Sequence, residues 1–284
     1  LDALPLPEAS AHADKEQRGR VLVVAGAAEL PGAAVLAAIA ALRAGAGKLQ
    51  IATVESIATA IGVAVPEAFV ARLPENAEGG ISLAAAKMLL PHVERAGAVL
   101  LGPGMVGRAD VAGLACAVLE RHDNPPLVLD AAALVDLMDA AALVRSQTGC
   151  VVLTPHHGEL AALLRIDIGK IRREPLQHAR ETARLLNAIV VLKGSDTFVA
   201  TPDGDDYCFS DGDVGLATSG SGDVLAGIIA GLLARGAPPH TASVWGSFLH
   251  AAAGARLARR FGKIGYLARE LLDEIAPAMA EAAG

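Results

Sequence analysis

The stretch GLATSGSGDVLAGIIAGLLARG, residues 215–236, runs from a glycine-rich loop directly into an apolar helical segment. Gly220 and Gly222 allow the backbone to turn tightly and to point successive N–H groups at one spot. The positive end of a helix dipole lies behind these groups. Gly220, Ser221 and Gly222 are therefore candidates for an anion hole that binds a phosphoryl group. Asp223 follows at the junction, where its carboxylate is placed to take a proton from a hydroxyl that attacks this phosphoryl group.

The same stretch also has an ordinary structural interpretation. Asp223 would cap the helix, and Gly220 and Gly222 would form a plain turn. Gly227 and Gly231 would then serve only to let a neighbouring helix pack closely. A Gly-Ser-Gly-Asp string alone does not separate the two interpretations, but the full length of the stretch favours the phosphoryl-binding loop.

Outward from this loop, the chain alternates short apolar runs with longer helical ones. The apolar runs are continuous, which is typical of strands in a parallel sheet that helices cover on both faces. This alternation predicts a doubly wound α/β fold, a three-layer α/β/α sandwich around a mostly parallel central sheet. The expected strands are residues 21–26, 48–53, 98–102, 127–130, 150–154 and 188–194. The expected helices are residues 31–44, 83–96, 110–121, 159–164 and 175–186.

The last third of the chain has a different pattern. Residues 198–209, FVATPDGDDYCF, predict a hairpin with PDGDD as its turn. Three helical stretches follow, at residues 224–234, 240–260 and 266–283. The sequence contains no internal repeat and no linker rich in Pro, Gly or Ser. We therefore expect a single domain over residues 1–284.

Composition argues against several classes of protein. Hydrophobic residues make up 53% of the chain and aromatic residues only 3%, which predicts a core of small aliphatic side chains. No apolar run approaches the roughly 20 residues that a bilayer span requires, so no membrane association is expected. The formal net charge of -7 argues against nucleic acid as a partner. A small anionic ligand remains possible, because helix N-termini bind phosphate without a net positive charge.

The cysteines also limit the possibilities. Cys116, Cys150 and Cys208 lie far apart and form no CxxC pair. Such a sparse, odd set argues against a disulfide framework and against a structural zinc site. We expect a cytoplasmic protein in which no cluster of protein side chains holds a resident metal.

The loop at 215–236 resembles the signature loop of the ribokinase-like superfamily, and more narrowly that of the NAD(P)H-hydrate dehydratases. Other segments resemble the same family in the same order, and any one of them alone is a weak signal. Together the resemblance runs from about His12 to the C-terminus. The segments are the unit at residues 18–53, PEA at 66–68, LLGPGM at 100–105, VLDAAAL at 128–134, VLTPHHGEL at 152–160 and VLKGSDT at 191–197.

This resemblance implies roles for particular residues. Asp223 would be the catalytic base and would also contact the substrate. The implied nucleotide contacts are Lys193, Gly194, Ser195, Asp196, Thr197 and Gly222. The hydrated nicotinamide substrate would be bound by Ala33, Gly104 and His156.

Taken singly, several of these residues have simpler explanations. Lys193 would be a solvated strand end, and Asp130, which closes an expected strand, would cap a loop. The Thr-Pro-His string that ends at His156 would be a turn before a helix with local polar caps.

Two positions depart from the family pattern. Many members carry a second acidic residue where this chain has Ala132, and the usual His-Pro-Gly-Glu is His-His-Gly-Glu here, with His157 in place of proline. Many relatives also carry an N-terminal epimerase domain, for which this chain has no room. The resemblance therefore implies a separate NAD(P)H-hydrate epimerase as a pathway partner.

The activity implied by the resemblance is the nucleotide-dependent dehydration of hydrated NADH or NADPH, in its S form, to NAD(P)H. Its co-substrate would be ADP or ATP with Mg²⁺, and stand-alone bacterial members of the family point to ADP, which would yield AMP and phosphate. The resemblance also implies a homotetramer.

Two other functions remain open from the residues alone. One is a ribokinase-like kinase that phosphorylates a small alcohol. The other is a Rossmann-type dehydrogenase, because GPGMVG at residues 102–107 follows an expected strand and Asp130 ends the next one. Against the dehydrogenase, Pro103 removes a backbone N–H between the first two glycines of that pattern.

Overall fold

The computed structural model describes residues 4–7, 18–121, 124–147, 150–210 and 212–283. The start of the family resemblance, at about His12, lies outside these ranges. Within them, no helix is both long enough and apolar enough to cross a bilayer.

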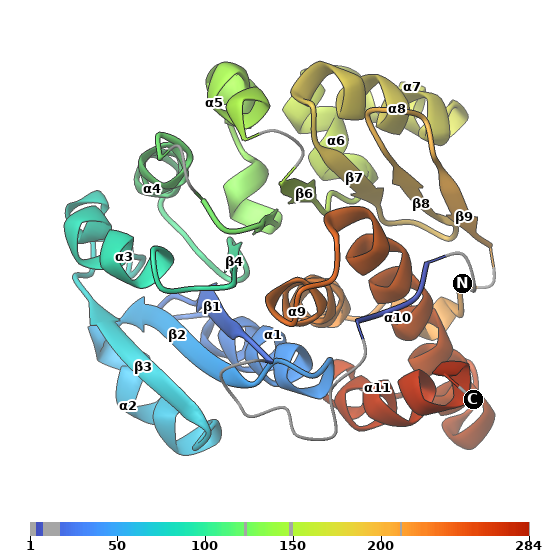
Figure 1. Ribbon diagram of the computed structural model, residues 1–284, viewed down its shortest axis with the longest axis horizontal. Coiled ribbons are helices and arrows are strands. Elements are labelled where there is room, and N and C mark those ends of the chain that lie inside the picture. Colours follow the sequence, from blue (N-terminus) through green and yellow to red (C-terminus); the bar gives the residue numbers. More distant parts are fainter. Residues whose placement is uncertain (1–3, 8–17, 122–123, 148–149, 211, 284) are drawn as a thin grey trace.

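One nine-stranded sheet runs through the structure in the order β3-β2-β1-β4-β5-β6-β7-β8-β9 (Figure 1). The strands from β1 to β7 are parallel, and β8 and β9 add antiparallel at the far edge. The order reverses between β1 and β4, which creates a crevice at the carboxyl ends of these strands. The strands are β1 (Arg20–Val24), β2 (Lys48–Val54), β3 (Ala68–Leu73), β4 (Ala98–Leu101), β5 (Leu127–Leu129), β6 (Val151–Leu153), β7 (Ile189–Leu192), β8 (Thr197–Ala200) and β9 (Tyr207–Phe209).

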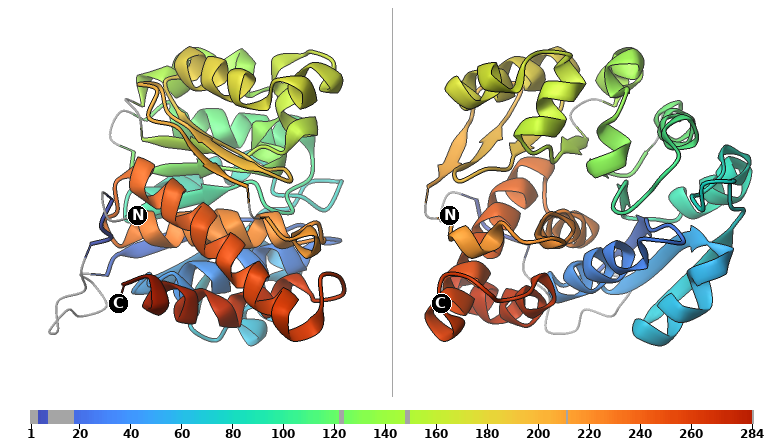
Figure 2. Two further views of the ribbon diagram at one scale, coloured as in Figure 1. Left: turned by 90° about the vertical axis from the view of Figure 1, so that its right-hand side faces the viewer. Right: turned by 180° about the vertical axis from the view of Figure 1, so that it is seen from behind.

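Helices cover both faces of this sheet, as the two further views show (Figure 2). On one face lie α1, α9 and α10, with α11 packed behind them, and on the other lie α3, α4, α5 and α8. The three-layer α/β/α sandwich is therefore confirmed. The helices are α1 (Pro31–Arg43), α2 (Glu55–Ala64), α3 (Ala86–Val93), α4 (Arg108–Leu119), α5 (Ala141–Ser146), α6 (His157–Leu164), α7 (Ile168–Arg173), α8 (Pro175–Leu186), α9 (Ser221–Ala234), α10 (Pro239–Phe261) and α11 (Ala268–Ala283).

The elements agree with those expected from the sequence except in a few places. The predicted helix at 83–96 is shorter and divided, because a 3₁₀ turn at Leu83–Ala85 precedes α3. The predicted strand at 188–194 ends at Leu192, which leaves Lys193 beyond it. The strand β3 and the helices α2, α5 and α7 were not expected. The missed strand is an edge strand that alternates exposed and buried positions, so it lacks the continuous apolar run of the central strands.

Close contact between α1 and α9 depends on glycine. A Cβ atom added at Gly227 would lie 2.3 Å from the carbonyl oxygen of Ala37, and one added at Gly231 would lie 2.3 Å from that of Ala41. Any side chain at these positions would push the helices apart. Because α9 begins at the glycine-rich loop, this packing also fixes where that loop lies relative to α1.

We expect Gly231→Val to destabilise the fold by about 3 kcal/mol or more, because the added side chain meets backbone that cannot move aside. Urea denaturation would measure this loss. Gly62→Ala is the matched control, since the added Cβ lies 3.7 Å from its nearest neighbour, on Val70. Its stability should stay equal or rise by up to about 1 kcal/mol. Equal losses in both variants would contradict the packing argument.

Candidate phosphoryl-transfer site

Three polar side chains follow three neighbouring parallel strands. Asp130 comes directly after β5, Thr154 after β6 and Lys193 after β7. The carboxyl ends of parallel strands meet at one edge of a sheet, so these side chains converge there.

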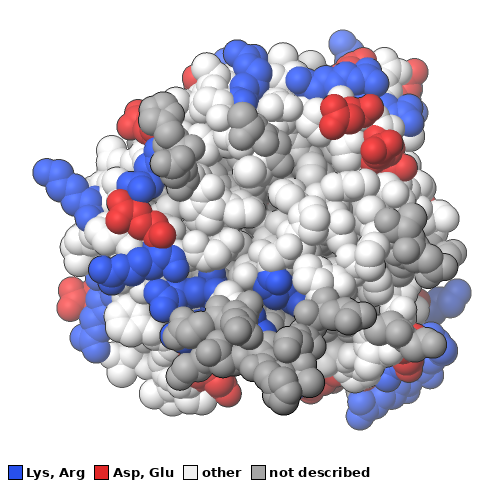
Figure 3. Space-filling model, viewed as in Figure 1, with Lys and Arg blue, Asp and Glu red and all other residues white. Residues whose placement is uncertain are grey.

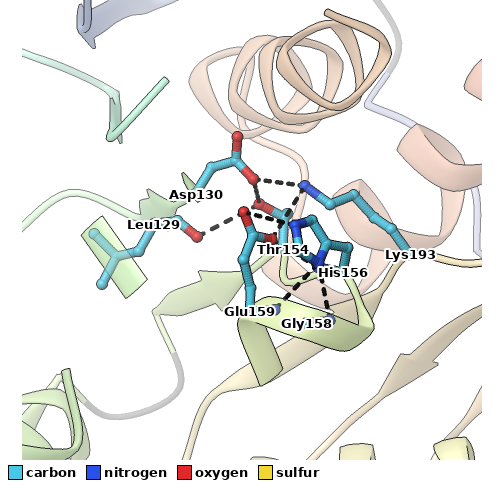
Figure 4. A network of polar contacts seen from close by, with 7 residues as sticks. All are labelled: Leu129, Asp130, Thr154, His156, Gly158, Glu159 and Lys193. Atoms are coloured by element: carbon cyan, nitrogen blue, oxygen red, sulfur yellow. Dashed lines mark hydrogen bonds and ion pairs between the residues drawn. The ribbon is translucent and has the colours of Figure 1, made fainter. Parts of the chain in front are cut away.

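Lys193 is the centre of this cluster, which Figure 4 shows from close by. Its Nζ donates to Oδ1 of Asp130 at 2.8 Å and lies 3.9 Å from Oε2 of Glu159. The hydroxyl of Thr154 donates to the same Oδ1 of Asp130 at 2.6 Å. The Asp130 side chain is 2% exposed and that of Lys193 is 18% exposed, so the pair is shielded from water. Burial alone would lower the pKa of Lys193, but the carboxylates of Asp130 and Glu159 outweigh it and raise the pKa, so the ammonium stays charged.

The Lys193 ammonium also reaches the start of α9. A Cβ atom added at Gly222 would lie 3.1 Å from Nζ of Lys193, so the glycine is what allows the ammonium to approach the backbone here. The sequence-predicted nucleotide residues Lys193 and Gly222 are thus brought together. The residue that follows β7 therefore lies next to the glycine-rich loop.

Asp223 lies in the first turn of α9, beside this cluster. Burial raises its pKa to about 6, and the negative charge of Asp130 raises it as well, while the positive charge of Lys193 partly offsets both. Glu159 adds a smaller effect in the upward direction. A carboxyl group with a pKa near neutrality is suited to accept a proton and release it again.

Two amide groups at the start of α9 are available to a ligand. The N–H groups of Gly222 and Asp223 have no hydrogen-bond acceptor within the part of the chain that the structure describes. The N–H of Ser221, by contrast, donates to the carbonyl oxygen of Thr218 at 3.2 Å. Gly220, which precedes the helix, has a φ of 89°, in the region that favours glycine. The free amides and the helix dipole make this turn a suitable anion site.

The first turns of α1 connect this loop to the crevice between β1 and β4. A Cβ atom added at Gly220 would lie 2.5 Å from Cδ1 of Leu36, and one added at Gly104 would lie 2.6 Å from Cβ of Ala33. The two predicted substrate residues Ala33 and Gly104 are therefore in contact with each other. Ala33 lies on α1, the helix that also carries Leu36, the neighbour of the anion site, whereas Gly104 lies in the loop after β4.

His156 acts as a cap for α6. Its Nδ1 accepts hydrogen bonds from the N–H groups of Gly158 and Glu159, and the Glu159 carboxylate accepts one from the N–H of His156. The interpretation of this segment as a turn before a helix with polar caps therefore accounts for the contacts of the His156 ring. Its side chain is nevertheless 58% exposed, and the strand bridge between His156 and Lys193 keeps it next to the cluster.

The segment from Gly194 to Thr197 connects β7 to β8 at the same edge. Gly194 and Ser195 are exposed, and Asp196 is half-buried. A Cβ atom added at Gly194 would lie 2.9 Å from Cε1 of His157, the residue that replaces the family's proline. His157 therefore packs under this segment.

The GPGMVG string does not form a dinucleotide-binding turn. The carbonyl oxygen of Pro103 accepts a hydrogen bond from the N–H of Gly26 at 2.8 Å, and a Cβ atom added at Gly102 would lie 1.8 Å from the carbonyl oxygen of Asp130. These glycines serve to pack neighbouring loops together. The Rossmann interpretation of this string is not supported by its geometry.

A pocket of about 470 Å³ lies at the opposite edge of the sheet, at the amino ends of β1 and β2. Lys and Arg side chains gather at the lower left of Figure 3, over the part of the molecule where β1, β2 and β3 lie. None of the cluster around Lys193 lines this pocket. We place the candidate site by its chemistry, at the carboxyl edge. The pocket is lined by Arg20, Gly47, Lys48, Leu49, Gln50, Glu67, Phe69, His92 and Arg95.

Together, the fold and the site define a class of protein. A solved structure of a ribokinase-like superfamily protein from Enterococcus faecalis, 24% identical, superposes with a TM-score of 0.82 over 97% of this chain and 92% of that one. The chain therefore has the ribokinase-like fold.

Sequence comparison identifies the family within this class. The family profile described as NAD(P)H-hydrate dehydratase matches residues 21–277. An ADP-dependent (S)-NAD(P)H-hydrate dehydratase from Xanthomonas campestris is 46% identical over 275 residues, which are 97% of this chain and 92% of that protein. The chain belongs to the NAD(P)H-hydrate dehydratase family.

Two further relatives extend this comparison. A bifunctional NAD(P)H-hydrate repair enzyme from Moorella thermoacetica is 40% identical over 95% of this chain and 50% of that protein. The structure of an ADP/ATP-dependent NAD(P)H-hydrate dehydratase from Bacillus subtilis, co-crystallised with ATP and Mg²⁺, superposes with a TM-score of 0.83 at 31% identity. That match covers 97% of this chain and 94% of the other.

The pKa of Asp223 leads to a prediction about stability. Its folded-state pKa lies above the ordinary value, so the stability that this group contributes is present at low pH and lost as the pH rises through about 6. Asparagine cannot ionise. We therefore expect Asp223→Asn to be more stable than the wild type by up to about 3 kcal/mol at pH 8, falling below about 1 kcal/mol at pH 4. Thermal unfolding of both proteins from pH 4 to 8 measures this difference in stability. A stability gain of Asp223→Asn that is larger at pH 4 than at pH 8 would contradict the prediction.

Proposed function

We propose that this protein is an ADP-dependent (S)-NAD(P)H-hydrate dehydratase, a carbon–oxygen lyase that restores NADH or NADPH from the hydrated form. The observation that carries this proposal is the position of Asp223, with a pKa raised to about 6, directly after the free amide of Gly222 and beside the Lys193 ammonium. A base, an amide pair and a fixed cation are what phosphoryl transfer to a hydroxyl requires.

In the proposed reaction, Asp223 takes the proton of the hydroxyl on the hydrated nicotinamide ring. The hydroxyl oxygen then forms a bond to the terminal phosphorus of ADP, and the bond from that phosphorus to the AMP oxygen breaks. Elimination follows: the carbon–oxygen bond breaks, phosphate leaves, and a proton is lost from the neighbouring ring carbon. Phosphate is a far better leaving group than hydroxide, which is why a kinase fold serves a dehydration.

The residues of this chain have separate tasks in that sequence. The amides of Gly222 and Asp223 would bind the oxygens of the terminal phosphoryl group, with the dipole of α9 behind them. Lys193, held by Asp130, would contribute positive charge that does not need to move when the transition state forms. The anion hole expected from the sequence also includes Ser221. In the structure the Ser221 amide donates to the carbonyl oxygen of Thr218, so it is not free to bind the phosphoryl group.

The remaining assignments are part of the proposal. The nucleotide would lie along Lys193 and its neighbours Gly194, Ser195, Asp196 and Thr197. Ala33, Gly104 and His156 would bind the hydrated substrate, supported by the contact between Ala33 and Gly104 in the crevice.

Mg²⁺ is proposed as part of the co-substrate. No group of three or more His, Cys, Asp and Glu side chains in the described ranges is placed to hold a metal ion. Asp130, the most buried carboxylate of the cluster, already accepts from Lys193 and Thr154. The side chains do not fit a resident metal site, whereas Mg²⁺ commonly arrives on nucleotide phosphates and keeps several waters.

The cellular context is proposed on the same basis. We place the protein in the cytoplasm as one domain, together with a separate NAD(P)H-hydrate epimerase, since it matches one half of bifunctional repair enzymes. An exposed apolar patch supports self-association, for which the family resemblance implies a homotetramer: Val214, Phe261, Ile264 and Leu267 are between 43% and 79% exposed. The carbonyl of Lys263 and the ring of Tyr266 pack against Gly215, so the patch joins the α10–α11 connection to the loop before α9.

One assay tests the proposed reaction against its alternatives. Purified protein is mixed with hydrated NADH, Mg²⁺ and either ADP or ATP, and both dihydronicotinamide absorbance and free phosphate are followed. We expect one phosphate for each NADH restored, faster recovery with ADP than with ATP, and none without nucleotide. Asp223→Asn should lower turnover by about 10²–10⁴-fold and leave ADP affinity almost unchanged.

The same assay separates the other activities. A kinase would leave hydrated NADH unchanged and keep the phosphate on another alcohol. A dehydrogenase would act without nucleotide. Either result, or full turnover in Asp223→Asn, would overturn the proposal.

We expect Gly222→Val to abolish ADP binding and keep the fold. The added side chain would crowd Nζ of Lys193, because a Cβ atom at this position already lies 3.1 Å from that atom. Isothermal titration calorimetry measures the affinity and circular dichroism checks the fold. Gly32→Ala is the control, since nothing lies within 4 Å of its added Cβ. A folded Gly222→Val protein with wild-type affinity for ADP would show that the phosphoryl group binds elsewhere.

A further inference from the structure

His250 lies beside the candidate site, although no sequence motif singles it out. It lies on α10, in contact with the start of α9. Its Nε2 lies 2.8 Å from Oγ of Ser221, at hydrogen-bond distance. Ser221 itself is 4% exposed. Its hydroxyl is therefore directed to α10 and away from any ligand.

The imidazole is held in its neutral form. Burial lowers the pKa of His250 to about 4, hydrogen bonding with Ser221 offsets part of that effect, and the positive charge of Lys193 lowers the pKa further. A neutral ring can hydrogen-bond to a hydroxyl without placing a second positive charge beside Lys193. It is a weak acid at neutral pH because the protonated, cationic form of the ring, which could release a proton, is hardly populated.

The start of α9 needs such a contact because it has no cap of its own. Its N-cap residue is Gly220, and no side chain caps the first turn. A helix start without a cap frays easily, and an uncapped glycine turn has many backbone conformations. Ser221 is the first residue of the helix and immediately precedes the two free amides. A hydrogen bond that fixes Ser221 also fixes the direction in which those amides point.

We propose that His250 is a positioning residue of the phosphate-binding turn: through Ser221 it holds the amides of Gly222 and Asp223 in the geometry that binds the terminal phosphoryl group of a nucleoside diphosphate. This inference rests on the proposed function for the identity of the ligand. His250 does not contact the reacting atoms, so its loss affects nucleotide affinity more than the chemical step.

The experiment compares ADP affinity, measured by titration calorimetry with Mg²⁺, in five proteins and the wild type: His250→Ala, His250→Gln, Ser221→Ala, the double alanine variant and His240→Ala. His240 is the matched control, because it is a half-buried histidine on the same helix whose ring packs on Tyr207, 5.2 Å away between centroids. Turnover at saturating ADP and thermal unfolding are recorded for each protein.

We expect His250→Ala and Ser221→Ala each to raise the Kd for ADP about tenfold, with kcat at saturating ADP within about threefold of the wild type. The double variant should bind like either single one, because both remove the same interaction. His250→Gln places an amide near the position of Nε2 and should restore most of the affinity. His240→Ala should bind ADP like the wild type even if its melting temperature falls.

Several outcomes would overturn the inference. Wild-type Kd in His250→Ala is one, and an equal rise in Kd for His240→Ala is another, since it would indicate a general loss of stability. If His250→Ala does not fold, wild-type Kd in Ser221→Ala decides against it. A wild-type protein that binds ADP but restores no NADH would overturn the proposed function alone, and the Kd series would still test the role of His250.

Discussion

The close backbone approach of α1 and α9 is the constraint on which the site depends. Gly227 and Gly231 lie directly against the carbonyls of Ala37 and Ala41, so the two helices are fixed by main-chain contact. Main chain cannot change rotamer, and its position is therefore more exact than that of packed side chains. The same contact sets the glycine-rich loop before α9 beside the first turns of α1, where Ala33 meets Gly104. The alanine-rich sequence of α1 fits this requirement, because small side chains allow the close approach.

The parallel sheet supplies the second half of the site. Asp130, Thr154 and Lys193 follow three adjacent strands, and their meeting point is a consequence of strand direction alone. Removing one member of a buried ion pair leaves the other charge without compensation. Lys193 and Asp130 are therefore best understood as one unit, in which the carboxylate orients the ammonium toward Gly222.

Much of this could be predicted from the sequence, and the failures have physical reasons. Continuous apolar runs predicted the central strands, and the glycine-rich stretch predicted where α9 begins. The pairing of Lys193 with Asp130 was within reach, because both residues were seen to end strands of one parallel sheet. His250 was not, since nothing in a sequence shows which residue of a long helix faces a loop 29 positions earlier. The sequence predicts a turn with local polar caps before α6, and the structure shows that the ring of His156 supplies this cap.

The charges of the candidate site favour backbone amides as its anion-binding groups. Asp130, Glu159 and Asp223 surround one ammonium, that of Lys193, so the cluster carries more acid than base. A nucleotide phosphate bound beside this cluster would add further negative charge. In addition to Lys193, its proposed binding therefore draws on groups that attract anions without being cations, namely the free amides of the first turn and the dipole of α9. Mg²⁺ carried by the nucleotide would reduce the same repulsion. A second cationic side chain beside Asp223 would instead stabilise the charged form of this carboxyl group. Its pKa would then fall, and Asp223 would be a weaker base. The neutral imidazole of His250, next to the proposed phosphate-binding turn, adds no positive charge that would lower the basicity of Asp223.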